Sequence, residues 1–338
     1  MTKRGTPFVI AEAGVNHNGD IGRAREMIAV AKKAGADSVK FQAFTAEGLV
    51  AAGTATAGYQ AANTGISDQV ELLRSLALSR RDFEMLARHC DDLGIEFLCT
   101  AFDVESVEAL VAMGMRRVKV ASGEMTNMPA LRRFAALGLP VLLSTGMATL
   151  DEVMRSVAVL RDAGACDITL LHCTSLYPAP DTAINLNAMT TMRERLGLPV
   201  GYSDHSAGDH VSVAAVALGA AVIEKHFTLD HSLPGPDHKA SLEPEELALF
   251  IGKLHATAIS LGDGVKRPAP GEAEIAKVVR RSWHATRDLP AGTIIGERDV
   301  ALKRPADGLS PDESPLGRTV SVFVAADSSI RSNHLVMS

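Results

Sequence analysis

The chain has 338 residues, of which 46% are hydrophobic and 22% are charged, the balance of an ordinary globular protein. Lys and Arg number 34 against 40 Asp and Glu, a net charge of −6, and aromatic residues make up only 4%. Because proteins that bind nucleic acids usually carry a positive surplus and aromatic stacking surfaces, we expect no nucleic acid as a partner.

The sequence also argues against a membrane protein. The longest nearly apolar run, Val211 to Ile223, has 13 residues, whereas a membrane-spanning helix needs about 20. The four cysteines, at positions 90, 99, 166 and 173, contain no Cys-x-x-Cys pair. We therefore expect reduced, mostly buried thiols in a cytoplasmic protein.

Eight short apolar runs with β-forming residues alternate with segments of helical spacing. The runs cover residues 8–13, 38–44, 96–102, 117–122, 140–145, 167–174, 200–205 and 221–228. The helical segments cover residues 22–34, 80–93, 103–113, 129–138, 149–163, 186–197, 207–219 and 243–261. Glycines follow seven of these segments, at positions 35, 94, 114, 138, 164, 197 and 219, where a left-handed helix end favours glycine. Asp103 and Asp151 are expected to begin helices.

Continuous apolar strands that alternate with helices predict a parallel sheet covered by helices. Eight such units within residues 1–262 match a closed (β/α)8 barrel (TIM barrel) in count and length. The alternative is an open doubly wound sheet, which usually carries a Gly-x-Gly-x-x-Gly loop after its first strand. Here that loop reads Gly14-Val15-Asn16-His17-Asn18-Gly19, and this difference favours the barrel.

The alternation ends at Leu261. Residues 262–271 contain three glycines and two prolines, which indicates a linker over 263–281. Short β-like runs at 283–285 and 320–324 then predict a small β-rich domain over 282–338. Residues 45–68 form the longest stretch without periodicity, and we interpret it either as a lid over a site or as a surface loop.

Polar side chains follow each predicted strand, from Glu12 after the first to His226 after the eighth. In a TIM barrel these strand ends meet around one site. His205 and His226 end adjacent strands, beside Asp204 and Glu224, and favour a divalent first-row metal over two hydrogen-bonded core histidines.

Two lysines and several hydroxyl groups in the same set indicate an anion site for phosphate or carboxylate. They are Lys40 and Lys119 with Thr100, Ser122, Ser144 and Ser203. A second interpretation makes Lys119 or Lys225 a Schiff-base lysine. Glu12 stands where a general base or an orienting group would act. Asp237 lies in a loop suited either to sugar hydroxyls or to a simple turn.

Seven ordered motifs resemble those of the sialic acid synthases, over nearly the whole chain. They are Phe8–Asp20, Val39–Gln42, Val118–Glu124, Leu143–Met147, His172–Thr174 with Tyr177-Pro178, Tyr202–His205 and Ile223–Phe227. Residues 282–338, with Lys303-Arg304-Pro305, are similar to the family's C-terminal antifreeze-like (SAF) domain.

The resemblance implies a transferase that condenses phosphoenolpyruvate with an N-acetylated amino sugar of the N-acetylmannosamine type. The product would be a nonulosonate such as N-acetylneuraminate, and phosphate would be released. His205 and His226 would hold Mn²⁺, with Mg²⁺ or Co²⁺ as substitutes. Phosphoenolpyruvate would bind Lys40, Thr100, Lys119, Ser122, Ser144 and Ser203.

The same resemblance implies that the sugar binds Gln42, Glu124, Tyr177 and Asp237. The catalytic residues would be Glu12, Lys119 and Glu124. Glu12 would move protons or orient the attacking enol. In a domain-swapped homodimer, Arg304 would reach the N-acetyl group from the partner's SAF domain.

Two departures from the family pattern leave the acceptor open. Ser175, expected beside both substrates, replaces an asparagine, and Ala101 replaces a proline. A legionaminate synthase that uses a 2,4-diacetamido-trideoxy sugar is therefore an alternative. A pyruvate-dependent metal aldolase and a carbohydrate-binding protein with an inert barrel are two further alternatives.

Overall fold

The computed structural model describes residues 5–336, and the chain divides into two compact units between Gly262 and Asp263. The first unit is the predicted closed barrel, in which eight strands pair in parallel in chain order and β8 closes onto β1. The strands are β1 (Phe8–Gly14), β2 (Ser38–Ala43), β3 (Glu96–Ala101), β4 (Val118–Val120), β5 (Val141–Ser144), β6 (Ile168–Cys173), β7 (Val200–Asp204) and β8 (Val222–His226).

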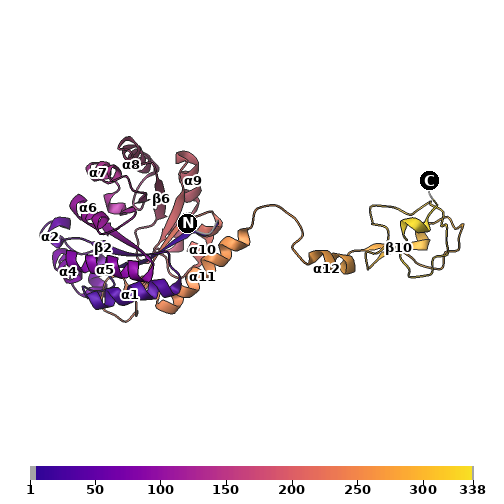
Figure 1. The fold of residues 1–338 in the computed structure, drawn as a ribbon, viewed down its shortest axis with the longest axis horizontal. Helices are drawn as coiled ribbons and strands as arrows, with labels where there is room; N and C mark the ends of the chain where they lie inside the picture. The colour runs from indigo at the N-terminus through magenta and orange to yellow at the C-terminus, as the bar shows by residue number, and fades with distance from the viewer. Residues whose placement is uncertain (1–4, 337–338) are drawn as a thin grey trace. The chain divides into compact units, whose positions relative to one another are not determined.

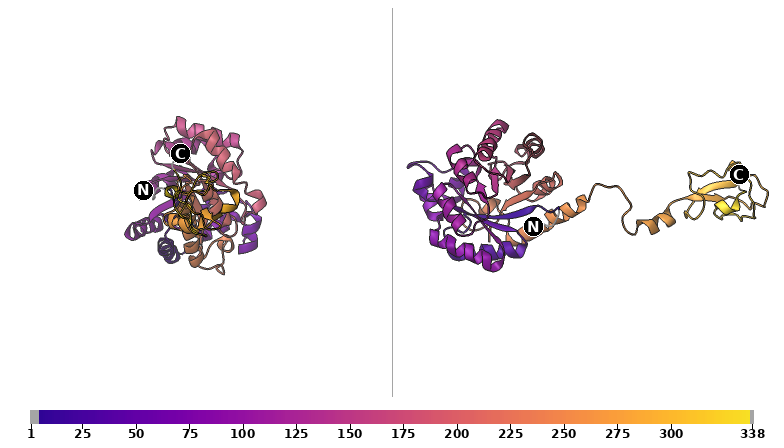
Figure 2. Two further views of the ribbon diagram at one scale, coloured as in Figure 1. Left: turned by 90° about the vertical axis from the view of Figure 1, so that its right-hand side faces the viewer. Right: turned by 45° about the horizontal axis from the view of Figure 1, so that its top comes forward.

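Helices surround the strands, as Figures 1 and 2 show. They are α1 (Ile21–Ala34), α5 (Arg80–Leu93), α6 (Val104–Ala112), α7 (Met128–Ala136), α8 (Leu150–Asp162), α9 (Asn187–Leu196), α10 (His210–Ala217) and α11 (Pro244–Leu261). Most of them turn an apolar stripe toward the sheet, and α1 buries Ala24, Met27, Ile28 and Ala31 at the predicted spacing, whereas α10 is apolar nearly all round. The alternating pattern of the sequence is therefore confirmed as eight strand–helix units.

The helix ends follow the predicted rules with one exception. All seven glycines that were expected after helices have positive φ angles, the conformation that glycine adopts without a Cβ penalty. Asp103 caps α6 by accepting the backbone N–H of Ser106. The prediction for Asp151 is wrong, because Thr149 caps α8 in a reciprocal capping box with Glu152.

Residues 45–68, predicted as a lid or a loop, contain α2 (Ala46–Leu49) and α3 (Gly58–Thr64), and α4 (Gln69–Leu76) follows. Leu72 and Leu76 of α4 pack with Val15 and Phe44 in a small core of their own. No helix in the described part of the chain is long and apolar enough to cross a membrane.

The second unit begins with α12 (Glu272–Val279), which lies inside the segment interpreted as a linker, and continues with the antiparallel strands β9 (Ser282–Ala285) and β10 (Val300–Lys303). Nine buried apolar residues form its core. The predicted strand at 320–324 is wrong, since Val320 and Val324 make only single bridges, to Leu335 and Leu289. The remaining short elements are 3-10 turns at Ser122–Glu124, Asp181–Ala183, His238–Ala240, Glu297–Asp299 and Ser332–His334.

Candidate active site

A cavity of about 530 Å³ opens at the carboxyl ends of the barrel strands. Thirteen of the fifteen predicted site residues line it: Glu12, Lys40, Gln42, Thr100, Lys119, Ser122, Ser144, Ser175, Tyr177, Ser203, His205, His226 and Asp237. Glu124 does not line it, because its carboxylate turns to Asn127 and accepts that amide at 2.8 Å. Arg304 belongs to the second unit.

Four buried charged groups form the floor of the cavity. Lys40 Nζ lies 2.9 Å from Glu12 Oε2 and 3.6 Å from Glu224 Oε2, and it donates to Thr100 Oγ1 at 2.9 Å. Lys119 Nζ lies 3.5 Å from Glu224 Oε1. Two ammonium groups are thus balanced by two carboxylates, and this pairing offsets the cost of burying each charge.

The pKa values follow from that pairing. Burial acts to lower the pKa of Lys40, but Glu12 and Glu224 together raise it above the ordinary value. Burial lowers the pKa of Lys119 despite its proximity to Glu224. Burial alone would raise the pKa of Glu224, yet Lys119 and Lys40 hold it at about 2. Burial raises the pKa of Glu12, against the opposing effect of Lys40.

Glu224 was predicted only as a neighbour of His205 and His226 and not as a member of the site. It contacts both lysines and accepts a hydrogen bond from Ser203 Oγ at 2.8 Å. The signal was present, because Glu224 stands two residues before His226 and so shares its inward face on the strand. Gln60, Gln69 and Leu73, from the helices above the cavity, were also missed.

Serine hydroxyls from neighbouring strands converge beside Gly146. The backbone N–H of Gly146 donates to Ser122 Oγ at 2.9 Å. A Cβ atom at position 146 would lie 2.4 Å from Ser175 Oγ and 2.8 Å from Ser122 Oγ, so glycine is required for this approach. Ser144 Oγ is buried without a hydrogen-bond partner among the described residues. The hydroxyls therefore form an arc suited to an anion.

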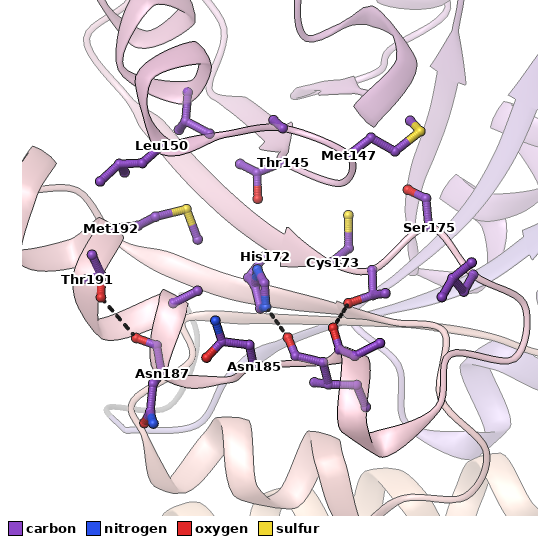
Figure 3. A pocket seen from close by; sticks show the side chains of 17 residues that line it. Thr145, Met147, Leu150, His172, Cys173, Ser175, Asn185, Asn187, Thr191 and Met192 are labelled. Atoms are coloured by element: carbon purple, nitrogen blue, oxygen red, sulfur yellow. Dashed lines mark hydrogen bonds between the residues drawn. The ribbon is translucent and has the colours of Figure 1, made fainter.

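A second cavity, of about 610 Å³, adjoins the first and shares Met147, Cys173 and Ser175 with it (Figure 3). Its side chains come from β6, α8, α9 and the loops after β5 and β6, and none of the described residues that line it is Lys, Arg, Asp or Glu. His172 bonds the Ile184 carbonyl at 2.7 Å, and burial lowers its pKa. The charged chemistry is therefore confined to the first cavity.

The two imidazoles end adjacent strands, with ring centres 5.6 Å apart. His205 Nδ1 lies 2.8 Å from the Thr174 carbonyl oxygen, and Nε2 lies 3.2 Å from the Tyr177 hydroxyl. Burial, and then the neighbouring His226, lower the pKa of His205 to about 4. Burial, and then Lys40, lower the pKa of His226 to about 3. Both rings are therefore neutral near pH 7, the form that binds metals.

The donor set fits a metal that keeps open coordination positions. Among the described residues, no group of three or more His, Cys, Asp or Glu side chains is arranged to hold an ion. His205 and His226 would thus be the only protein ligands in that part of the chain, leaving room for substrate and water. The Nδ1 atom of His226 is buried without a partner there, which is consistent with an external ligand.

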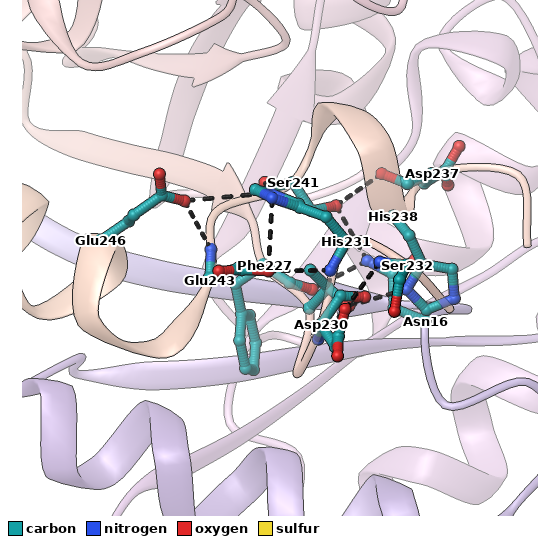
Figure 4. Close-up of polar contacts among 11 residues, drawn as sticks. Asn16, Phe227, Asp230, His231, Ser232, Asp237, His238, Ser241, Glu243 and Glu246 are labelled. Carbon is teal, nitrogen blue, oxygen red and sulfur yellow. Dashed lines mark hydrogen bonds and ion pairs between the residues drawn. The ribbon is translucent and has the colours of Figure 1, made fainter. Parts of the chain in front are cut away.

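A hydrogen-bonded loop after β8 places Asp237 at the cavity (Figure 4). Asn16 Nδ2 donates to the Phe227 carbonyl and to Ser241 Oγ, and Ser241 Oγ donates to the Asp237 carbonyl at 2.7 Å. The Oδ1 atom of Asp237 is buried without a partner among the described residues. Burial, and then Glu12, raise the pKa of Asp237 to about 7, so this carboxyl can donate or accept a hydrogen bond.

Comparisons with known proteins agree with this geometry. Residues 27–266 match the NeuB family and residues 280–336 match the SAF domain. The chain is 43% identical to an N,N'-diacetyllegionaminic acid synthase of Legionella pneumophila, over 98% of this chain and 95% of the relative. It is 45% identical to the synthase of the same name from Campylobacter jejuni, over 90% and 92%.

A solved structure of an N-acetylneuraminic acid synthetase from Leptospira borgpetersenii, in complex with citrate, is also similar. Its identity to this chain is 35% and its TM-score is 0.71, over 80% of this chain and 90% of that one. The similarity therefore extends from the motifs to the whole barrel.

Proposed function

Because the chain belongs to the NeuB family, whose members are phosphoenolpyruvate-dependent condensing enzymes, we propose that it joins phosphoenolpyruvate to an N-acylated amino sugar aldehyde. The acceptor is a 2,4-diacetamido-trideoxy sugar and the product is a legionaminate, the alternative that the sequence left open. Two relatives named as diacetyllegionaminic acid synthases, each more than 40% identical, support this acceptor. The convergence of Lys40, Lys119 and the serine arc on one cavity carries the proposal.

The reaction forms one carbon–carbon bond and releases phosphate. The enol carbon of phosphoenolpyruvate adds to the aldehyde carbon, the oxygen of a water molecule adds to the former enol-ether carbon, and the bond from that carbon to the phosphate oxygen breaks. Lys119 and the serine arc hold the phosphate, while Lys40 neutralises the carboxylate of phosphoenolpyruvate. Holding both reactants in one cavity lowers the entropic part of the activation free energy.

Glu12 and Asp237 are the groups that handle protons. Glu12 Oε1 accepts a hydrogen bond from Gln42 at 3.0 Å, which fixes the carboxylate toward the cavity. Asp237, with its pKa near 7, exchanges a proton with a sugar hydroxyl or the aldehyde oxygen.

The proposal includes a divalent ion, Mn²⁺ or in its place Mg²⁺ or Co²⁺, held by His205 and His226. When bound, such an ion polarises an aldehyde oxygen as a Lewis acid. His226→Asn should weaken Mn²⁺ binding by at least about tenfold, since loss of a group that merely supports a metal ligand already costs that much. A titration followed by the electron paramagnetic resonance of free Mn²⁺ measures the change. Unchanged binding would remove His226 from the metal site.

Phosphate release is the decisive assay. We expect phosphate when phosphoenolpyruvate is mixed with the 2,4-diacetamido sugar and Mn²⁺, and no phosphate after chelation by EDTA. Product formation from pyruvate without phosphate release would instead indicate the aldolase. Sugar binding confined to the SAF domain, with no turnover, would indicate the carbohydrate-binding alternative.

We also propose a cytoplasmic homodimer in which the SAF domain of one chain contributes Arg304 to the active site in the barrel of the other. Exposed apolar side chains of the second unit, Ile275 and Val278 on α12 and Phe323 beyond it, support an interface. Free thiols at all four cysteines support a reducing compartment.

A further inference from the structure

The wall of the cavity divides into three sectors around the barrel. The carboxyl ends of β4 to β6 and the residues just after them carry the hydroxyl arc, and the ends of β7 and β8 carry the imidazoles. The loops after β1 and β3 contribute Val15 and Phe102, and α4 lies above them. This third sector, which we call the α4 wall, consists of Val15, Phe102, Leu72, Leu73, Leu76, Gln60 and Gln69.

The α4 wall contains no charged side chain. Among the described residues that line the whole cavity, Lys40 and Lys119 are the only lysines or arginines, and both already contact carboxylates. Phosphoenolpyruvate carries a phosphate and a carboxylate, and these two anionic groups pair with the two lysines. A second phosphoryl group at the α4 wall would therefore be desolvated without a cationic partner from the barrel, which is unfavourable.

The wall also offers two amides among its apolar groups. The side chain of Gln69 has no hydrogen-bond partner among the described residues, and Gln60 uses only Oε1, which accepts the Ala57 N–H at 3.3 Å. Asn63 Nδ2 donates to the Pro236 carbonyl at 2.8 Å. That bond ties α3, the helix that carries Gln60, to the loop of Asp237, so one amide of the wall and the Asp237 carboxyl are positioned together.

We propose that the α4 wall selects the acceptor: Leu73 contacts a deoxygenated terminal carbon, Gln69 bonds an N-acyl group, and a phosphorylated sugar is rejected. This inference rests on the proposed function and adds the residues that determine its specificity. Selection by the α4 wall requires that the terminal carbon of the acceptor carry no charged group. An apolar pocket discriminates against an added hydroxyl by about 10-fold to 100-fold, and an unpaired charged group is rejected more strongly.

The test uses the full-length protein, phosphoenolpyruvate and Mn²⁺ with three 2,4-diacetamido sugars, whose terminal carbon bears hydrogen, hydroxyl or phosphate. We expect kcat/KM for phosphate release to fall about tenfold from the first to the second and at least about 100-fold to the third. If the phosphorylated sugar reacts within about threefold of the deoxy sugar, the inference is overturned. If no sugar releases phosphate, the proposed function itself fails.

Leu73→Lys tests the wall directly, with Ser75→Lys as the matched control. Both add one positive charge to α4, but Ser75 is exposed and does not line the cavity. Leu73→Lys should narrow the preference for the deoxy sugar over the phosphorylated sugar by about tenfold or more, and Ser75→Lys should not change it. Equal effects of the two variants would contradict the assignment.

Gln69→Leu tests the role of the Gln69 amide without adding a charge to the α4 wall. It should raise KM for the diacetamido sugar about fivefold or more, the effect of one lost hydrogen bond, while KM for phosphoenolpyruvate stays unchanged. An unchanged sugar KM would remove Gln69 from the acceptor site.

Discussion

At the scale of single residues, the anion site depends on Gly146, which has no side chain. Gly146 has a backbone that other residues can adopt, since its φ is not in the left-handed region, but a Cβ there would press on Ser175 and Ser122. The serines could relieve the contact only by moving apart. The site is therefore sensitive to a change that leaves the backbone unstrained.

Gly146→Ala should raise KM for phosphoenolpyruvate by about 10-fold to 100-fold, because displaced hydroxyls lose one or two hydrogen bonds to the anion. KM for the sugar should change far less. Gly252→Ala on α11 is the control, since Gly252 does not line the cavity and a Cβ there meets nothing within 4 Å. Steady-state kinetics with each substrate varied in turn would show the effect, and equal KM values in both variants would contradict it.

His17 links pH to stability through burial. Its side chain is fully buried, its Nδ1 accepts the Gly19 N–H at 3.1 Å, and burial, followed by Arg23, lowers its pKa from 6.5 to about 4. The unfolded chain therefore binds this proton first as pH falls. The stabilisation is complete above pH 6.5 and is lost progressively down to about pH 4.

His17→Asn removes this titration while its side-chain oxygen can still accept the Gly19 N–H. Between pH 7 and pH 5 the free energy of unfolding should fall by about 2 kcal/mol more in the parent protein than in the variant. Urea denaturation at both pH values measures the difference. Parallel losses in the two proteins would show that His17 does not carry this dependence.

At the scale of elements, β7 and β8 are joined by a ladder of polar pairs. The register sets Ser203 opposite Glu224 and Asp204 opposite Lys225. The first pair lines the cavity; the second does not and is almost fully buried. Lys225 Nζ lies 3.1 Å from Asp204 Oδ2 and donates to the Ser206 carbonyl at 2.6 Å.

Lys225→Met should lower the free energy of unfolding by about 3–5 kcal/mol, because it leaves the Asp204 carboxylate buried without its cation. Adding Asp204→Asn should recover part of that loss. Lys253→Met breaks an exposed pair with Asp209 and should cost less than about 1 kcal/mol. Chemical denaturation of the three proteins tests this order, and equal losses from the buried and the exposed pair would contradict it.

The same elements show what the sequence could predict. The barrel strands are buried on both faces, so their apolar runs are continuous and easily recognised. Most of the helices between them carry a clear 3.6-residue period, although α10 does not. Glu224-Lys225-His226 shows the limit, since alternation along the strand places Glu224 on the face of His226 but does not show that Glu224 contacts both lysines at the floor of the cavity. Gln60 of the α4 wall lies in the segment 45–68 that was interpreted as a lid or a loop. Helix α4 itself was not predicted, because its eight residues bury only three apolar side chains, too few to show a repeating period.

The second unit was harder to predict. The strand at 320–324 was expected from its β-branched residues, but Val320 and Val324 pair with different segments, so no continuous ladder forms. Strand β10 has only four residues, most of them partly exposed, and is too short to show a repeating pattern in the sequence. Small domains bury little surface, so the apolar runs of their strands are short and hard to recognise in the sequence.

At the scale of the whole molecule, each unit has its own core. The apolar cluster of the barrel and that of the second unit share no residue, so function in one unit can be removed without unfolding the other. This independence allows the proposed exchange of SAF domains between two chains to be tested by mixing inactive variants.

Lys119→Ala disables the barrel and Arg304→Ala disables the SAF contribution. If the SAF domain serves the partner's barrel, a mixed dimer contains one site in which both residues are intact. Random mixing makes half of the dimers mixed, and each has one of two sites active, so about a quarter of the parent activity should return. Phosphate release after co-refolding of the two variants measures it. Lys119→Ala mixed with Lys40→Ala is the matched control, because both changes disable barrels and no mixed dimer then contains an intact site; equal activity in the two mixtures would exclude the exchange.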